Sequence, residues 1–391
     1  MVRPSTGRAQ GGMARNRPGG PSGDARSWAT LPPMSRAVVN PFARPAPIAP
    51  VASLLAVPQA DGAVRCNVCA HRCLVRPGRL GICGVRENRD GTLLATSYGR
   101  VVAAALDPIE KKPLFHVAPG STAWSIATPG CPFHCTFCQN WEIAQGPRLG
   151  LDLPVRTTLP EDVVREAVAL GAGAIAYTYV EPTVFLEYAL DTGRLARAAG
   201  LRNLWITDGY ATPEAVELLA TFVDAANVDL KSLDDHFYRR LCGARLAPVL
   251  EAILAMRSAG IWLEITTLVI PGHNDSPGEL GAIAGWIVEH LGPETPWHVS
   301  RFHPEYKLVD APPTPRPTLA RAAAIGREAG LAHVYVGNAP ELGSEDTRCA
   351  GCGTVLLERR GYRTRSRLTA DGACPDCGRP LAGIGLGGGA G

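Results

Sequence analysis

The sequence predicts an α/β protein built on a partial (β/α)6 barrel of the TIM type. A small cysteine-rich head at residues 61–118 precedes the barrel, and a four-cysteine module at 341–384 follows it. Between residues 119 and 340, apolar runs of strand length alternate with amphipathic stretches of helix length, which is typical of a parallel sheet wound by crossover helices. The chain has 391 residues, of which 46% are hydrophobic, so it can bury a sizeable core.

Residues 1–60 are predicted to be a disordered extension. They hold ten prolines, six glycines and seven arginines but one acidic residue, Asp24, and such a composition offers little apolar surface to pack. Residues 61–391 carry 32 basic side chains against 35 acidic ones, so the overall charge of +3 comes from the extension. Bulk charge therefore gives no argument for nucleic-acid binding. A short flexible tail is expected at 385–391.

Targeting signals and cysteine spacing indicate the cellular compartment of the protein. No run of about 18 apolar residues is present, as a membrane helix would need, and no convincing secretory signal is found. The twelve cysteines fall mostly in tight groups, which favour thiolate–metal chemistry in a reducing compartment over disulfides. We therefore expect a soluble, cytoplasmic protein that does not bind a membrane.

Six strands and the helices between them make up the predicted barrel. The expected strands are Trp124–Thr128, Ala174–Tyr179, Asn203–Thr207, Ala226–Leu230, Leu263–Val269 and His298–Phe302. The expected helices lie near 160–170, 182–199, 213–221, 247–259 and 276–291. A further helix near 318–329 and a strand at His333–Val336 extend the edge. In such a barrel the functional side chains follow the strands, at their C-terminal ends.

Three cysteines lie within eight residues, directly after the first predicted strand. From residue 128 the loop reads Thr-Pro-Gly-Cys131-Pro-Phe-His-Cys135-Thr-Phe-Cys138-Gln-Asn-Trp. Three thiolates can hold three irons of a cubane [4Fe–4S] cluster and leave the fourth iron open to a substrate, whereas electron-transfer clusters normally take four. The alternative is a zinc ion completed by His134 or by a distant residue.

This cysteine spacing, after a strand and at the start of a helix, resembles that of radical S-adenosylmethionine (SAM) enzymes. The resemblance implies that the open iron chelates the amino and carboxylate groups of SAM, and that Phe137 lies near the adenine. Later strand ends are similar to those of the glycyl-radical-enzyme activases. Glu181-Pro182 matches half of their Gly-Gly-Glu-Pro element, in which Tyr179 and Val180 replace the glycines.

Further strand ends extend the similarity to the activases. Thr207-Asp208-Gly209 resembles their Thr-Asn-Gly turn, and Asp229-Leu230-Lys231 matches their Asp-Leu-Lys. The SAM contacts implied by the resemblance are Phe137, Glu181, Thr207, Asp208, Asp229, Lys231 and, after the sixth strand, His303. Each acid also has an ordinary interpretation: Glu181 and Asp229 as helix N-terminal acids, and Asp208 in a turn.

Two four-cysteine groups flank the barrel. Cys66, Cys69, Cys73 and Cys83 fit a closed site, either structural zinc, which we favour, or a second iron–sulfur cluster. Cys349, Cys352, Cys374 and Cys377 form two Cys-x2-Cys knuckles, each followed by glycine, and resemble a zinc ribbon or rubredoxin-like module, for which we expect zinc.

A short hairpin is expected between the knuckles of this ribbon. Its arginines are interpreted as a solvated strand face rather than as a nucleic-acid surface; they are Arg359, Arg360, Arg363, Arg365 and Arg367. Cys242 stands alone in the sequence, and we expect it to be non-essential.

Taken together, the motifs over residues 61–384 look like those of the AmmeMemoRadiSam system radical SAM enzymes, relatives of the pyruvate formate-lyase activating enzymes. The resemblance implies that a reduced [4Fe–4S] cluster cleaves SAM to methionine and a 5′-deoxyadenosyl radical, which takes hydrogen from a protein or another macromolecule. It also implies a flavodoxin- or ferredoxin-like electron donor. The alternatives are a glycyl-radical-enzyme activase and a non-catalytic iron–sulfur and zinc scaffold that binds nucleic acid or protein.

Overall fold

The structure is a computed structural model that describes residues 48–339, 342 and 345–387. Most of the extension expected to be disordered, residues 1–47, lies outside the described residues, as do residues 388–391 of the expected tail. The prediction was wrong for residues 48–60. There β1 (Val51–Ala52) pairs with β6 (Thr92–Ala95), and β2 (Ala56–Pro58) pairs with β3 (Val64–Cys66). The head therefore begins earlier than the sequence predicted.

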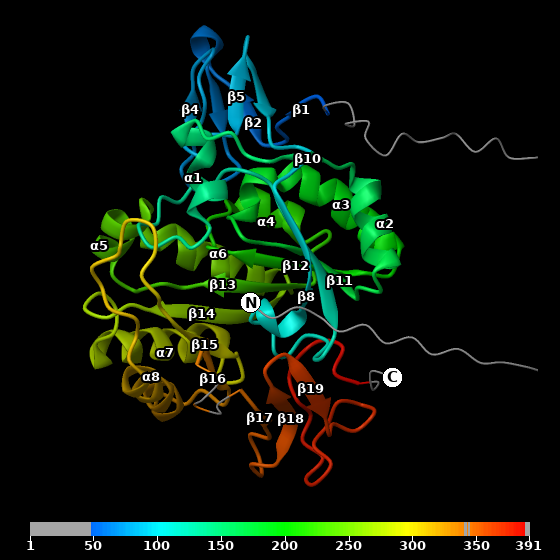
Figure 1. Cartoon of the computed structure of the whole chain (residues 1–391), viewed down its shortest axis with the longest axis vertical. Coiled ribbons are helices and arrows are strands. Elements are labelled where there is room, and N and C mark those ends of the chain that lie inside the picture. Colours follow the sequence, from blue (N-terminus) through cyan, green and yellow to red (C-terminus); the bar gives the residue numbers. More distant parts are fainter. Residues whose placement is uncertain (1–47, 340–341, 343–344, 388–391) are drawn as a thin grey trace, which may run out of the picture. The chain divides into compact units, whose positions relative to one another are not determined.

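The main sheet has eight strands in the order β16-β15-β14-β13-β12-β11-β9-β8 (Figure 1). Its parallel strands are β9 (Thr122–Ala127), β11 (Ala174–Tyr177), β12 (Arg202–Thr207), β13 (Ala225–Asp229), β14 (Trp262–Val269), β15 (Trp297–Arg301) and β16 (Val334–Gly337). At the edge, β8 (Ala103–Pro108) runs antiparallel to β9. This confirms the predicted α/β fold with a parallel sheet and adds one antiparallel strand.

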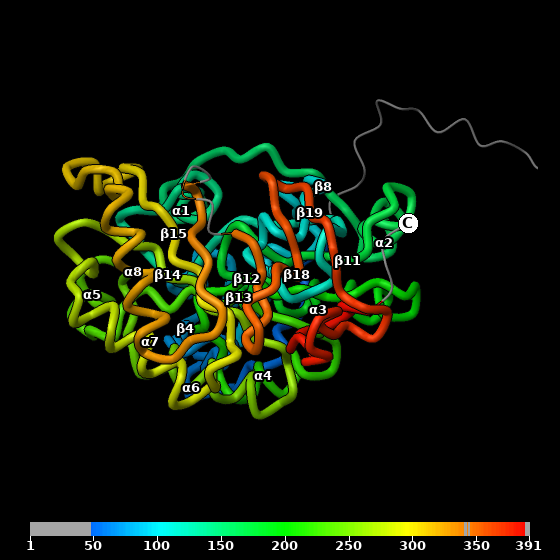
Figure 2. The backbone as a smooth tube through the Cα atoms, turned by 90° about the horizontal axis from the view of Figure 1, so that it is seen from below, coloured from blue at the N-terminus to red at the C-terminus, as the bar shows by residue number. Residues whose placement is uncertain are grey.

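Helices connect the parallel strands. They are α1 (Trp141–Leu149), α2 (Pro160–Ala169), α3 (Leu186–Ala198), α4 (Pro213–Leu219), α5 (Asp235–Phe237), α6 (Leu246–Ser258), α7 (Pro277–Leu291) and α8 (Arg316–Glu328). Proline occupies the first turn of several, and Thr212 and Ser276 cap α4 and α7 by accepting backbone N–H groups, which defines where these helices begin. Figure 2 shows α3, α4, α6, α7 and α8 following one another around one side of the strands. None of the helices in the described part of the chain is long and apolar enough to span a membrane.

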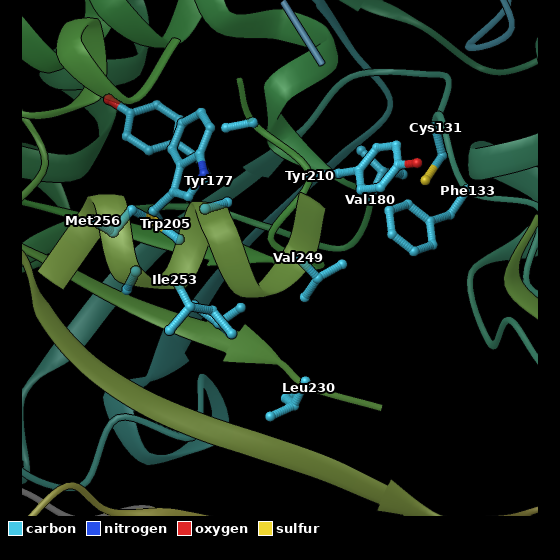
Figure 3. Packing of buried hydrophobic residues seen from close by; sticks show 14 of the residues in the cluster. Cys131, Phe133, Tyr177, Val180, Trp205, Tyr210, Leu230, Val249, Ile253 and Met256 are labelled. Atoms are coloured by element: carbon cyan, nitrogen blue, oxygen red, sulfur yellow. The ribbon is translucent and has the colours of Figure 1, made fainter. Parts of the chain in front are cut away.

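Aromatic side chains fill the space between the sheet and its helices. Tyr177 and Trp205 are fully buried with their rings 5.6 Å apart, and Figure 3 shows them side by side. The ring of Phe222 packs closely against α3 at Gly193. A Cβ at this position would lie 2.2 Å from that ring, so the close approach requires glycine. Burial of each such side chain contributes roughly 1.5–3 kcal/mol to the free energy of folding. This packing fixes the strands against the helices.

The head is made of very short strands. One sheet has the order β1-β6-β5, with β5 at Arg86–Arg89, and the other has β2-β3-β4, with β4 at Leu74–Val75. A separate ladder joins β7 (Arg100–Val101) to β10 (Arg156–Thr157). Arg86 attaches the head to α3 through two bonds to Glu187, of 2.8 and 2.7 Å.

The ribbon is an antiparallel sheet of β17 (Thr347–Arg348), β18 (Val355–Arg360) and β19 (Arg363–Ser366). The interpretation of Arg359 as part of a solvated face was wrong, since this residue is 2% exposed. Its guanidinium lies 4.1 Å from the centre of the Phe115 ring and donates to the Phe115 carbonyl oxygen at 2.8 Å. Arg359 therefore fastens the ribbon to the segment between β8 and β9 of the main sheet.

Candidate active site

A cavity of about 310 Å³ lies at the C-terminal ends of the parallel strands, within the usual size range for small-molecule sites. Nearly all of the residues predicted from the strand ends line it. They are Cys131, Cys135, Phe137, Cys138, Glu181, Thr207, Asp208, Asp229 and Lys231. His303 is exposed and is not among the residues that line the cavity.

The loop that carries the three cysteines is held from several sides. Phe133 is buried with its ring 5.0 Å from that of Tyr210, and Figure 3 shows this pair beside Cys131. His134 and Thr136 donate their backbone N–H groups to carbonyl oxygens of the π-helical turn Tyr238–Cys242, at 2.7 and 2.8 Å. These contacts hold the three thiols in place on the rim of the sheet.

The three thiols fit an iron–sulfur cluster better than a single metal ion. A tetrahedral zinc with Zn–S bonds of ~2.3 Å brings its sulfurs within about 4 Å of one another. Among the described residues, the only group of metal-ligating atoms that all lie within 4.8 Å is in the ribbon. His134, the alternative zinc ligand, bonds to Arg148 instead. Cys131, Cys135 and Cys138 form no such group among the described residues, and a cluster does not require one, because each thiolate binds a different iron.

Burial governs the protonation of these thiols. It raises the pKa of Cys131 well above the usual value for a thiol and raises that of Cys138 to about 12. Without a metal both are therefore neutral, and iron binding has to displace their protons.

Glu181 organises the ends of β11 and β12. The residue is 1% exposed, and Oε2 accepts from Thr207 Oγ1 at 2.7 Å and from the backbone N–H of Asp208 at 2.6 Å. Oε1 accepts from the backbone N–H of Thr183 at 3.1 Å and from its hydroxyl. Burial, followed by the charge of Asp208, raises the pKa of Glu181 to about 7. Its carboxyl group thus caps the turn after β11 and positions Thr207 and Asp208 around the cavity.

Lys231 joins the next two strand ends. Its Nζ lies 2.7 Å from Asp208 Oδ1 and 3.0 Å from Asp229 Oδ2. Burial disfavours the ammonium, but the two carboxylates outweigh it and raise the pKa of Lys231 above its usual value. The Asp229 side chain remains 41% exposed, so it can still accept a hydrogen bond from a ligand.

A second polar cluster on the cavity wall was not predicted. Asp107 of β8 accepts from Lys112 Nζ and from the Tyr179 hydroxyl, both at 2.6 Å. Tyr179 adopts a φ of +67°, which residues other than glycine rarely do. The Asp-Pro-x-x-Lys-Lys run at residues 107–112 is the sequence signal that could have indicated this cluster.

Cys242, which stands alone in the sequence, lies beside Cys135 of this site. The residue is fully buried, and a side-chain hydrogen bond links it to Cys135 and raises the pKa of Cys135. No cysteine spacing could have indicated this, because more than a hundred residues separate the two.

The ribbon cysteines form a compact tetrad. Cys349 Sγ lies 3.5 Å from Cys377 Sγ, and Cys352 Sγ lies 3.6 Å from Cys374 Sγ. All four sulfurs lie within 4.8 Å of one another. This spacing fits a single tetrahedral metal ion.

Comparison with known proteins supports these assignments. A family model described as the radical SAM superfamily matches residues 125–280, which include the cysteine loop and the ends of β9 to β14. An uncharacterized protein of Methanocaldococcus jannaschii is 45% identical over 299 residues, covering 76% of this chain and 88% of that protein.

More distant similarity links the chain to activating enzymes. The benzylsuccinate synthase activating enzyme of Thauera aromatica is 27% identical over 150 residues, covering 37% of this chain and 45% of that enzyme. The pyruvate formate-lyase-activating enzyme of Clostridium pasteurianum is 22% identical over 194 residues, covering 46% and 80%. The chain therefore spans less than half the length of the first of these two enzymes.

Proposed function

Because this chain belongs to the radical SAM superfamily, we propose that its cavity binds SAM beside a [4Fe–4S] cluster held by Cys131, Cys135 and Cys138. When bound, the two groups supply one-electron cleavage of SAM to methionine and a 5′-deoxyadenosyl radical that abstracts hydrogen from a substrate. The observation that carries the proposal is that the three thiols and the polar ends of β11, β12 and β13 line one cavity.

The residues of the chain bind and orient SAM. The partly exposed Asp229 carboxylate accepts a hydrogen bond from the ligand, and Lys231 holds Asp229 and Asp208 in place through its two ion pairs. Phe137, 4% exposed on the cavity wall, offers its ring to the adenine. Glu181 is a positioning residue, since protein groups already occupy both of its oxygens.

The test is SAM cleavage by anaerobically reconstituted protein with a strong reductant, measured as 5′-deoxyadenosine. Replacing Cys131, Cys135 and Cys138 by alanine should abolish it. The matched control replaces the exposed ribbon thiols Cys352 and Cys377, which should lower stability more than cleavage. Persistent cleavage by the triple variant would overturn the assignment and favour a non-catalytic scaffold.

We further propose that the substrate is a protein or another macromolecule and that a flavodoxin- or ferredoxin-like protein donates the electron. The similarity to activating enzymes supports both, since protein targets are implied by their names. The head and ribbon motifs support membership in the AmmeMemoRadiSam group, with zinc in the ribbon. Unpaired cysteines in metal-type spacings support a reducing compartment such as the cytoplasm.

The second candidate is a glycyl-radical-enzyme activase. It is favoured by the matches to two activating enzymes and requires a partner that acquires a stable glycyl radical. Electron paramagnetic resonance of the protein with co-purified partners separates the candidates, because a persistent organic radical on the partner appears only for an activase.

A further inference from the structure

A second, smaller cavity lies in the head, and four thiols line it. They belong to Cys66, Cys69, Cys73 and Cys83. Three of the four cysteines are buried and Cys73 is half-buried. The remaining wall includes Val68, Ile82 and Val184, so the space between the thiols is largely apolar and shielded from water.

The spacing of these thiols excludes the compact geometry seen in the ribbon. Among the described residues, the four ribbon cysteines form a group that could hold a single metal ion, with their sulfurs within 4.8 Å of one another, whereas the head cysteines form no such group. A single tetrahedral ion draws its ligands together and leaves no cavity between them. A cubane cluster occupies the space between its ligands, because each thiolate binds a different iron. The loop cysteines Cys131, Cys135 and Cys138 likewise form no single-ion group among the described residues.

Arg86 supplies an independent indication of a bound group. It is 2% exposed and lines the same cavity. Its Nη atoms bond to Ser53, Val184 and Glu187, but its buried Nε has no hydrogen-bond partner in the described part of the chain. A buried N–H without an acceptor costs about 1–3 kcal/mol, and hydrogen bonds to cluster sulfurs are a known feature of iron–sulfur sites.

We propose that the head binds a second [4Fe–4S] cluster, with Cys66, Cys69, Cys73 and Cys83 as its ligands and Arg86 Nε–H donating to one of its sulfurs. Four protein ligands leave no open iron, so this cluster binds no SAM. The proposal replaces the zinc favoured from the sequence, and it does not depend on the function proposed for the larger cavity.

The head site lies next to the loop that carries Cys131. Arg148 Nη1 donates to the carbonyl oxygen of Ile82 at 2.7 Å and to that of Cys131 at 3.0 Å. A Cβ on Gly130 would lie 2.9 Å from the Cys83 carbonyl oxygen. The head site therefore packs directly against the loop of the first cluster. Because the head strands have only two to four residues, metal binding is expected to supply much of the head's folding free energy.

The decisive experiment uses the full chain with Cys131, Cys135 and Cys138 replaced by alanine, reconstituted anaerobically with iron and sulfide. Iron and sulfide analysis with Mössbauer spectroscopy should still show one [4Fe–4S] cluster per chain, and metal analysis should show one zinc. SAM should leave the Mössbauer spectrum unchanged. A variant with two zinc ions and no iron, or a spectrum that SAM changes, would overturn the proposal.

Two further variants assign the remaining metals. Adding Cys66→Ser and Cys69→Ser to the triple variant should remove the remaining iron but keep the zinc. Adding Cys352→Ala and Cys377→Ala to the triple variant instead should remove the zinc but keep the iron. If the head variant does not fold, the triple variant alone still decides the metal. If the wild-type protein holds two clusters but does not cleave SAM, the proposed function is refuted and the head site is not.

Discussion

Replacement of Asp229 tests the assignment of the larger cavity most directly. Its carboxylate lines the cavity, is 41% exposed and has one protein partner, Lys231 at 3.0 Å. A hydrogen bond to a charged group contributes about 1.5–3 kcal/mol, so Asp229→Ala should weaken SAM binding by roughly tenfold to a hundredfold. Asp229→Asn keeps a neutral acceptor and should cost about half that free energy, since charge-assisted bonds are roughly twice as strong as neutral ones.

The same variants should have little effect on folding. Lys231 keeps its 2.7 Å ion pair with Asp208 when Asp229 is removed, so no buried charge is left without a partner. For a pair in which one side is 41% exposed, solvent screening limits the loss of stability to about 0–1 kcal/mol. A loss of affinity with an almost unchanged melting temperature is therefore the expected signature.

The assay is equilibrium dialysis of labelled SAM against reconstituted, oxidised protein, so that no turnover occurs, with the visible absorbance of the cluster recorded in parallel. Glu217→Gln, an exposed acid on α4, is the matched control. Wild-type affinity in Asp229→Ala with an intact cluster would show that this carboxylate does not contact SAM.

Three other changes have distinct outcomes. The folded protein binds more protons than the unfolded chain between pH 4.5 and 7 because the pKa of Glu181 is raised from 4.5 to about 7. The stability of the metal-free protein should therefore fall by up to about 3 kcal/mol as pH rises through this window, and denaturant melts should show that Glu181→Gln lacks this fall. Cys242→Ala removes the hydrogen bond to Cys135 and should lower the cluster's reduction potential in a redox titration. Cys242→Ser should have a potential closer to that of the wild type. Equal potentials in Cys242→Ala and wild type would show that Cys242 donates no hydrogen bond to the cluster ligand. Arg359→Met should lower stability by about 3–5 kcal/mol because it leaves the buried Glu110 carboxylate, 3.7 Å from Arg359 Nε, without its charged partner, whereas exposed Arg360→Met should change thermal melts little.

The barrel could be predicted because its signals are local. Strands such as Ala174–Tyr177 are continuous apolar runs, and helices such as α7 begin at a capping serine and a proline, so each element is recognisable without its neighbours. The head could not be predicted in the same way. Val51 and Ala52 become a strand only because Ala95 and Leu94 lie opposite them, and no pattern within a two-residue strand indicates such a partner.

The candidate site also contains residues that could be predicted from the sequence and residues that could not. Glu181 and Asp229 were predicted because both lie at the C-terminal ends of predicted strands, in motifs that resemble those of the activases, and parallel strands bring such residues to one edge. Asp107 and Lys112 were missed because β8 runs antiparallel to its neighbour, a direction that the alternation of strands and helices does not indicate. The metal of the head could not be decided from the sequence for another reason: cysteine spacing along the chain does not determine the distance between sulfurs.

Charge on the cavity wall formed by β11, β12 and β13 explains which ligand it prefers. Three carboxyl groups and one ammonium line this wall, from Glu181, Asp208, Asp229 and Lys231. Lys231 balances one carboxylate, and the proton that Glu181 retains below a pH of about 7 balances another. One negative charge remains without a counter-ion on this wall. The Asp229 side chain is 41% exposed, so this charge becomes costly when a bound ligand excludes water from it. A ligand with a positive group near Asp229 relieves that cost, whereas an uncharged ligand of the same shape does not. SAM carries such a positive charge on its sulfonium, so the Asp229 variants should lose more affinity for SAM than for the analogue whose sulfur is a neutral sulfide.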